Sequence, residues 1–175
     1  MLTGLFALTG IAVVLWWVPP EPAMPVHRPR GSLALVLRDP ALLRLDLGVF
    51  VLHAVQLAMW VVIPTLLVQA GLDKDAHWQV YTPAVLASFF VLRGTLYPLE
   101  RRGYLRAVFL ASVGVIGLVQ VGLLWAAWQA GNGSPSLSLL AWLLFVFFCG
   151  FNILESCQPS LASRVAPQHA RGAAL

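Results

Sequence analysis

The side chains best suited to chemistry in this chain are few, and each falls inside or beside a long apolar stretch. His53, Gln56 and Trp60 recur at three- and four-residue spacing, which puts them on one face of a helix. Such a polar and aromatic stripe could line a water-filled cavity and contact a substrate, and the imidazole could exchange a proton near neutral pH. A hydrogen bond to a neighbouring helix would explain the same residues, so both interpretations stay open.

Glu155 is the most informative single candidate, because it is a carboxylate at the end of an apolar stretch. Asn152 precedes it by three positions, so a helix would place both side chains on similar faces. A carboxylate in that setting needs a cation, and we expect the partner to be Arg101 or Arg102 on an adjacent basic connection. Such a pair would join two helices either as a permanent anchor or as part of a gate, and the sequence favours neither.

Arg93 lies about one helical turn inside another apolar stretch, near the end that leads into the same basic connection. Its long side chain can extend to the membrane surface, and a role in a gate is the alternative. The sequence contains no nucleophile elbow, no glycine-rich phosphate loop and no histidine or cysteine set at metal-ligand spacing. We therefore expect no enzyme, no bound metal and no cofactor.

Five apolar stretches must position these residues. They are Leu2–Val18, Leu47–Ala70, Gln79–Tyr97, Ala107–Ala130 and Leu139–Cys157. A helix rises about 1.5 Å per residue, so roughly 20 residues cross a hydrocarbon core of about 30 Å, and only the first stretch is slightly short. The mean hydropathy of +0.82 and the 10% of charged residues exclude an ordinary soluble domain. The sequence predicts an all-α, polytopic transmembrane helix bundle of five spans.

The distribution of arginine and lysine predicts the orientation of this bundle. Nine of these cations lie in Pro19–Asp46, in Pro98–Arg106 and after Cys157, whereas the opposite connections contain only Lys74. Cytoplasmic loops carry such an excess, so we expect the N-terminus outside and the C-terminus in the cytoplasm. The net charge of +4 is thereby explained without nucleic acid as a partner.

The first connection differs from the others in composition. Five prolines within residues 19–29 block a helix and favour extended chain. Residues 33–45 then mix apolar with charged side chains, which predicts a short helix at the membrane surface, with Pro40 placed to open a helical turn. The expected organisation is one helix at 1–18, a cytoplasmic linker with the surface helix at 19–46, four helices at 47–157, and a cytoplasmic tail at 158–175.

Small residues recur along the fourth apolar stretch. Gly122, Ala126 and Ala130 are spaced by four, and Gly114 and Gly117 precede them on the same helix. Small residues on one stripe let a neighbouring helix approach closely. This stretch is therefore predicted to be a packing helix.

Two segments resemble transporters of the major facilitator superfamily. Residues 98–106, PLERRGYLR, are similar to the basic loop in the C-terminal half of these transporters. Residues 151–161 and 163–167, followed by 170–174, place an apolar helix, an acid, a proline and Arg-Gly in one order. That order looks like the end of the tenth helix and the next loop in the YajR-type branch of the drug-efflux members. On this resemblance the chain covers helices six to ten of twelve, and its linker joins two six-helix halves.

The resemblance implies alternating access around a central site, usually driven by the proton gradient. It implies that Arg101, Arg102 and Glu155 belong to a cytoplasmic gating network and that the stripe containing His53 lies on a cavity helix. The implied partners are the lipid bilayer of the cell inner membrane, a small-molecule substrate, protons and the remaining helices of the same transporter. Because the first five and last two helices of the family are absent here, we expect the chain alone to be inactive.

The function predicted from the sequence is therefore transport of small molecules, as part of a proton-coupled efflux antiporter. Export and proton coupling follow from the resemblance and not from the residues themselves. The alternative is a small five-span scaffold or subunit of a larger membrane complex. A membrane-embedded enzyme is disfavoured, because no acids, bases or metal ligands converge in the sequence.

Overall fold

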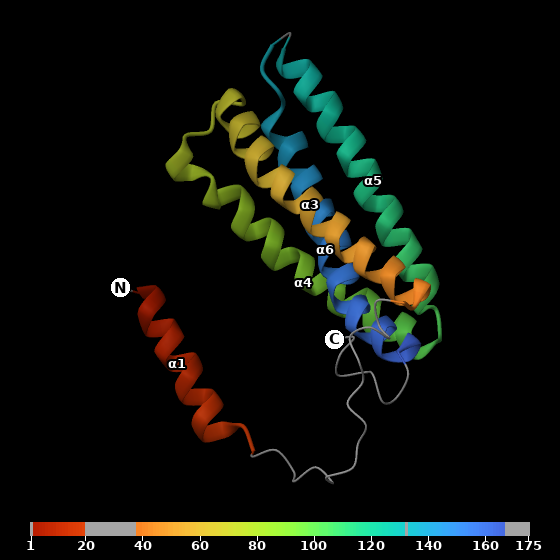
Figure 1. The fold of residues 1–175 in the computed structure, drawn as a ribbon. Coiled ribbons are helices and arrows are strands. Elements are labelled where there is room, and N and C mark those ends of the chain that lie inside the picture. The colour runs from red at the N-terminus through yellow and green to blue at the C-terminus, as the bar shows by residue number, and fades with distance from the viewer. Residues whose placement is uncertain (1, 20–37, 132, 167–175) are drawn as a thin grey trace. The chain divides into compact units, whose positions relative to one another are not determined.

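A computed structural model describes residues 2–19, 38–131 and 133–166 of the chain (Figure 1). The helices are α1 (Leu2–Trp17), α3 (Pro40–Gln69), α4 (Trp78–Arg101), α5 (Leu105–Ala130) and α6 (Leu137–Val165), with a 3₁₀ turn, η1, at Lys74–Ala76. No strand occurs among the described residues, which confirms the all-α fold class. The helices from α3 to α6 are long and apolar enough to cross a membrane, and α1 is a shorter apolar helix of 16 residues.

The chain divides into two compact units, Met1–Arg30 and Gly31–Leu175. The described helix of the first unit is α1, whose apolar side chains are exposed nearly all round, Trp16 and Trp17 most of all. A helix that is apolar on every side is typical of a membrane segment. The proline-rich part of the expected linker and the end of the expected tail, residues 20–37 and 167–175, lie outside the described residues.

Helix α3 begins where the sequence places a helix start. The carboxylate of Asp39 accepts hydrogen bonds from the backbone N–H groups of Ala41 at 2.8 Å and Leu42 at 3.4 Å, and Pro40 occupies the first turn. The helix then continues to Gln69 over 30 residues. Residues 40–45, which we expected in a surface helix, are thus the first turns of the long helix itself, because no helix-breaking residue separates them from Leu47.

Helix α6 also extends further than its apolar stretch predicts. It passes through Pro159 and ends at Val165, so residues 158–165 of the expected tail are helical. Proline has no N–H to donate, which leaves the carbonyl oxygen of Glu155, one turn earlier, without that helical bond. The extension carries two polar side chains, Ser160 and Arg164, to the end of α4.

The centre of the second unit is α6. Half of its most apolar window is buried, against 17–28% for the other three long helices. Figure 1 shows α6 between α4 and α5, and it contacts α3 as well. Its buried side chains include three aromatic rings, Phe147, Phe148 and Phe151, which lie together in the main apolar core. Each neighbour therefore buries its apolar stripe against the same helix.

Close packing of α5 on α6 depends on three small residues. An added Cβ at Gly150 of α6 would lie 3.0 Å from Ile116 Cγ1 and 3.4 Å from the carbonyl oxygen of Ser112, and one at Gly122 would lie 2.7 Å from Leu143 Cδ2. Ala126 is fully buried. The predicted packing role of α5 is supported at Gly122 and Ala126, whereas Gly114 has open space around it.

We expect Gly150→Val to destabilise the detergent-solubilised protein by about 1–3 kcal/mol, because the added methyl groups would overlap α5 near Ser112. The matched control is Gly114→Val, the same change on a helix position with open space. Thermal unfolding monitored by intrinsic fluorescence measures both variants. Equal stability of the two would contradict the close approach of α5 and α6.

Candidate functional site

The first polar contact between distant segments joins α3 to α6. The Nε2 atom of His53 lies 3.2 Å from Oε1 of Glu155, and both side chains are about half exposed. The other ring nitrogen, Nδ1, lies 2.9 Å from the carbonyl oxygen of Val49, one turn back on α3. The imidazole is therefore held at both nitrogens.

These two contacts restrict where protons can be. A carbonyl oxygen only accepts hydrogen bonds, so the contact with Val49 places a hydrogen on Nδ1 of His53. A hydrogen bond at the contact with Glu155 would need either an imidazolium that donates to a carboxylate or a neutral ring that accepts from a protonated carboxyl. Either arrangement would place one proton between Nε2 and Oε1. Without that proton, two acceptors would face each other and repel.

Aromatic packing orients the imidazole. The ring of Phe151 stands edge-on to that of His53, with centroids 5.9 Å apart and planes at 73°. Phe151 in turn stacks on Phe147 at 5.7 Å. Since Phe151 lies one turn before Glu155 on α6, that helix supplies both the apolar contact and the carboxylate.

The partner of Glu155 differs from the one expected from the sequence. We expected Arg101 or Arg102, and in the described residues the carboxylate instead contacts His53. The reason is helical geometry: α6 runs on past Glu155 by more than two turns, so the basic end of α4 meets a later part of α6. The sequence did not indicate this pair, because His53 and Glu155 are far apart in the chain and belong to different helices.

The rest of the stripe on α3 lies outside the main core. Gln56 is half-buried, and Trp60 is exposed and packs against the ring of Tyr81 on α4 at 6.3 Å. The buried residues of α3, among them Leu52, Met59 and Ile63, lie directly beside this stripe around the helix. The spacing argument for one common face thus holds, and a substrate cavity beside it stays a prediction.

Asn152 points to a different helix from Glu155. Its Nδ2 donates to the hydroxyl oxygen of Ser88 on α4 at 2.7 Å, and that hydroxyl donates to the carbonyl of Val85 at 2.6 Å. Ser88 is fully buried. Three helical positions turn a side chain by about 60° from exact alignment, which is enough to direct Asn152 toward α4 and Glu155 toward α3. The expected common face is therefore divided between two neighbours.

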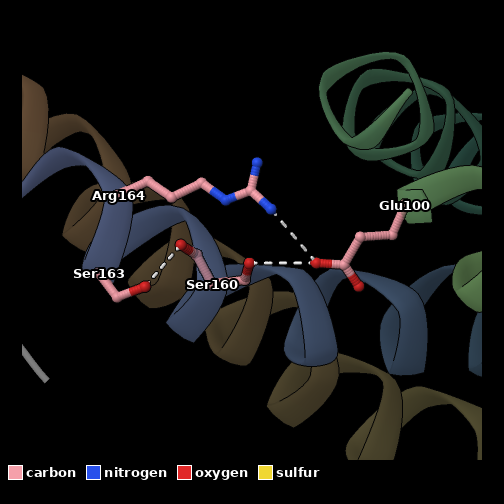
Figure 2. A network of polar contacts seen from close by, with 4 residues as sticks. All are labelled: Glu100, Ser160, Ser163 and Arg164. Atoms are coloured by element: carbon pink, nitrogen blue, oxygen red, sulfur yellow. Dashed lines mark hydrogen bonds and ion pairs between the residues drawn. The ribbon is translucent and has the colours of Figure 1, made fainter. Parts of the chain in front are cut away.

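A second network joins the ends of α4 and α6 (Figure 2). Oε1 of Glu100 accepts from the hydroxyl of Ser160 at 3.3 Å and lies 3.5 Å from Nη2 of Arg164. The hydroxyl of Ser163 donates to the carbonyl of Ser160 at 2.9 Å. We did not select Glu100 from the sequence. The signal available was the four-residue spacing of Ser160 and Arg164, which places a donor and a cation on one face.

The turn after α4 presents the arginines expected in a gate. Gly103 adopts φ +83°, which favours glycine, and its N–H bonds the carbonyl of Glu100 at 2.9 Å. Arg93, Arg101 and Arg102 line one surface hollow of about 610 Å³. The structure thus places Arg93, Arg101 and Arg102 around one hollow, whereas Glu155 contacts His53 instead. Within the described residues, no three His, Cys, Asp or Glu side chains are grouped to hold a metal ion.

Comparison with known proteins gives consistent matches. A family model described as Major Facilitator Superfamily matches residues 1–175. The chain is 31% identical over 180 residues to the inner membrane transport protein YajR of Escherichia coli (strain K12), covering 98% of this chain and 37% of that protein. It is 29% identical over 150 residues to the uncharacterized transporter BU466 of Buchnera aphidicola subsp. Acyrthosiphon pisum (strain APS), covering 86% and 36%. The chain spans little more than a third of the length of these relatives.

We expect the Asn152–Ser88 contact to couple α4 and α6 by roughly 0.6 kcal/mol and at most about 1.7 kcal/mol, the average and the largest value found for hydrogen bonds between the helices of one membrane protein. Asn152→Ala and Ser88→Ala should each destabilise the protein, and the double variant by less than their sum. Gln120→Ala combined with Asn152→Ala is the control, because Gln120 bonds the sulfur of Met59 instead. Additive effects for Asn152 and Ser88 in thermal unfolding would contradict the contact.

Proposed function

This chain belongs to the Major Facilitator Superfamily, and on that premise we propose that it forms part of a transporter that exports small molecules in exchange for protons. Membrane transport is the activity named for both relatives, one of them in an inner membrane. The coverage of about a third of those relatives fits the assignment of the chain to helices six to ten of twelve. On this assignment α1 would belong to one six-helix half and α3 to α6 to the other.

The observation that carries proton coupling is the contact of His53 with Glu155. It joins two helices that are distant in sequence, and a hydrogen bond there would need a proton between Nε2 and Oε1. Imidazole and carboxylate are the groups most often used for proton relays within membranes. Binding and release of that proton would therefore make and break a direct link between α3 and α6.

The His53–Glu155 pair is separated along the helices from the other charged residues of the second unit. Each described helix from α3 to α6 carries other charged residues only near one end or near the turn between α4 and α5: Arg44, Asp46, Arg93, Glu100, Arg101, Arg106 and Arg164. The nearest carboxylate along α3, Asp46, is seven positions from His53, about 10 Å along the axis. A proton taken up between the imidazole and Glu155 therefore has no second acid–base pair among these helices to move to.

Alternating access links this proton to substrate movement. With the proton in place, α3 and α6 are tied by a charge-assisted hydrogen bond, which is stronger than a neutral one. When the proton leaves, the facing lone pairs favour separation of the two helices. If the polar stripe of Gln56 and Trp60 borders the substrate path, the same helix movement changes its access. Substrate and proton would then bind in alternation, as export against a proton gradient requires.

Glu155→Gln tests this coupling in the full-length protein in lipid vesicles. An amide keeps the shape and its NH₂ group can donate to the neutral Nε2 of His53, but it cannot ionise, so we expect transport driven by a proton gradient to fall at least about tenfold. With Cys149 and Cys157 replaced by alanine, a cysteine placed at Ser156 reports helix movement through its maleimide labelling rate, divided at each pH by the rate for the denatured protein to remove the pH dependence of the thiol itself. This ratio should vary with pH in the otherwise unchanged protein and become independent of pH in Glu155→Gln. Ethidium serves as the trial transport substrate, and labelling needs no substrate.

Glu100→Gln is the matched control, because it removes a carboxylate that is paired with Arg164 and not with an imidazole. This variant should keep the pH dependence of labelling at Ser156. If Glu155→Gln also keeps it, the His53–Glu155 contact is a fixed anchor and the proposed proton site is wrong.

The proposed orientation puts the N-terminus of the chain outside and its C-terminus in the cytoplasm. Single cysteines at Ser134 and Tyr104, both exposed, test it in a background in which Cys149 and Cys157 are replaced by alanine. A membrane-impermeant maleimide should label Ser134→Cys in intact cells and Tyr104→Cys only after lysis. The reverse pattern would overturn the orientation.

A further inference from the structure

The hydrogen bond between α6 and α4 that lies nearest to the proposed proton pair is made by Asn152, three positions before Glu155 and about 4.5 Å away along the axis. Its Nδ2 atom lies 2.7 Å from the hydroxyl oxygen of Ser88. That hydroxyl has one proton, which it donates to the carbonyl oxygen of Val85 at 2.6 Å. Its oxygen therefore accepts from the amide, which fixes the direction of both hydrogen bonds, and Ser88 is fully buried.

Apolar packing alone does not define how α6 is turned about its own axis. With 3.6 residues per turn, its nine buried residues are spread over about 220° of the circumference. The close approach of α5 at Gly150 prevents a large rotation. A small rotation only exchanges one apolar contact for another, because the hydrophobic effect has no preferred direction. The exact orientation of α6 must therefore come from its polar contacts.

A small rotation of α6 is enough to separate Glu155 from His53. Helical side chains end about 5–6 Å from the axis, so a rotation of about 10° moves a carboxylate oxygen by about 1 Å. Nε2 of His53 and Oε1 of Glu155 are 3.2 Å apart, and the usual range for a hydrogen bond between N and O ends at about that distance. A rotation away from α3 would therefore break the contact.

The bond between Asn152 and Ser88 opposes this rotation. Asn152 and Glu155 are on the same helix, about 60° apart around its axis, so one rotation displaces both side chains. The bond is short, at 2.7 Å, and stretching it by about 0.5 Å takes it to the end of the usual range. Breaking it leaves the amide without a partner in a buried interface, which costs more free energy than the bond contributes when it is formed.

The second polar link between α4 and α6 among the described residues controls this rotation less well. Glu100 contacts Ser160 at 3.3 Å and Arg164 at 3.5 Å, and the side chain of Arg164 is 61% exposed (Figure 2). Both partners lie more than one turn beyond Glu155, on the far side of Pro159, where a helical hydrogen bond is missing. The shorter, buried and nearer bond therefore determines the rotation of α6 at the level of the carboxylate.

We propose that Asn152 and Ser88 are positioning residues for the His53–Glu155 pair: their hydrogen bond fixes the rotation of α6 so that the carboxylate faces the imidazole. Neither residue touches the exchanged proton. A fully satisfied buried polar contact of this kind specifies one arrangement among several apolar alternatives. The role in transport rests on the proposed proton coupling, whereas the orientation of α6 does not.

Cross-linking between α3 and α6 tests this orientation without any exchange of protons. The background is the full-length protein in lipid vesicles, with Cys149 and Cys157 replaced by alanine and with the changes His53→Cys and Glu155→Cys. The two new thiols take the places of side chains that face each other. The rate of cross-linking by o-phenylenedimaleimide is divided by the rate of labelling by N-ethylmaleimide, which corrects for access to each thiol.

In this background we expect Asn152→Leu to lower the corrected cross-linking rate about threefold to fifteenfold. This is the change in the ratio of two orientations that one hydrogen bond between membrane helices supports. Leucine has the same branched shape as asparagine, and Ser88 keeps its bond with Val85, so the folded protein is retained. Ser88→Ala, which removes the acceptor, should lower the rate to a similar extent.

Gln120→Leu is the matched control, because it removes an amide that donates to the sulfur of Met59 and joins α5 to α3. It should leave the corrected rate unchanged. Asn152→Gln keeps an amide donor and should retain part of the rate that Asn152→Leu loses. An unchanged rate in Asn152→Leu, or an equal loss in Gln120→Leu, would overturn the proposal, since the second result would show a general effect on packing.

Transport separates this proposal from the proposed proton site. With His53 and Glu155 intact, Asn152→Leu should lower proton-driven ethidium transport about threefold or more, and Gln120→Leu should not. If Glu155→Gln lowers transport and Asn152→Leu changes neither transport nor cross-linking, the positioning role is wrong and the proton site stands. If Glu155→Gln leaves transport unchanged while Asn152→Leu still lowers the cross-linking rate, the proton site is wrong and the orientation of α6 by Asn152 stands.

Discussion

The constraint on which this structure depends is the cost of an unpaired polar group in an apolar surrounding. Backbone groups avoid that cost by forming helices, and a polar side chain on such a helix needs a partner on a neighbour. Helix α6 meets this requirement three times with three different partners. Asn152 bonds Ser88, Glu155 contacts His53, and Ser160 with Arg164 holds Glu100. The central helix is thus also the one that organises the polar contacts.

These contacts join α3, α4 and α5 to α6 in different ways. Helix α4 is joined to α6 at two levels, by the Asn152 bond and by the Glu100 network, and neither contact requires an exchange of protons. Helix α5 packs closely at Gly150 and Gly122. Among the described residues, the polar contact of α3 with α6 is the one between His53 and Glu155. The proposed exchange of a proton at this pair would therefore move α3 relative to α4, α5 and α6, which are held together by the other contacts.

The sequence Glu100-Arg101-Arg102 shows how one turn can serve two purposes. Its acid faces α6, and its two cations face outward with Arg93. The positive φ of Gly103 reverses the chain directly after them. The carboxylate is bound by Ser160 and Arg164, so Arg101 and Arg102 are free to line the surface hollow beside Arg93.

Hydropathy and charge along the chain determined the fold class and the existence of each long helix, because these depend on local composition. They did not determine the ends of α3 and α6, since a helix continues past its apolar stretch when packing and side-chain contacts extend it. Candidate residues such as His53 and Glu155 were also recognisable, because ionisable groups are rare in apolar segments. Their pairing was decided only by the tertiary structure. The orientation of α6 about its own axis directs Asn152 to α4 and Glu155 to α3. Residue spacing within one helix does not reveal that orientation.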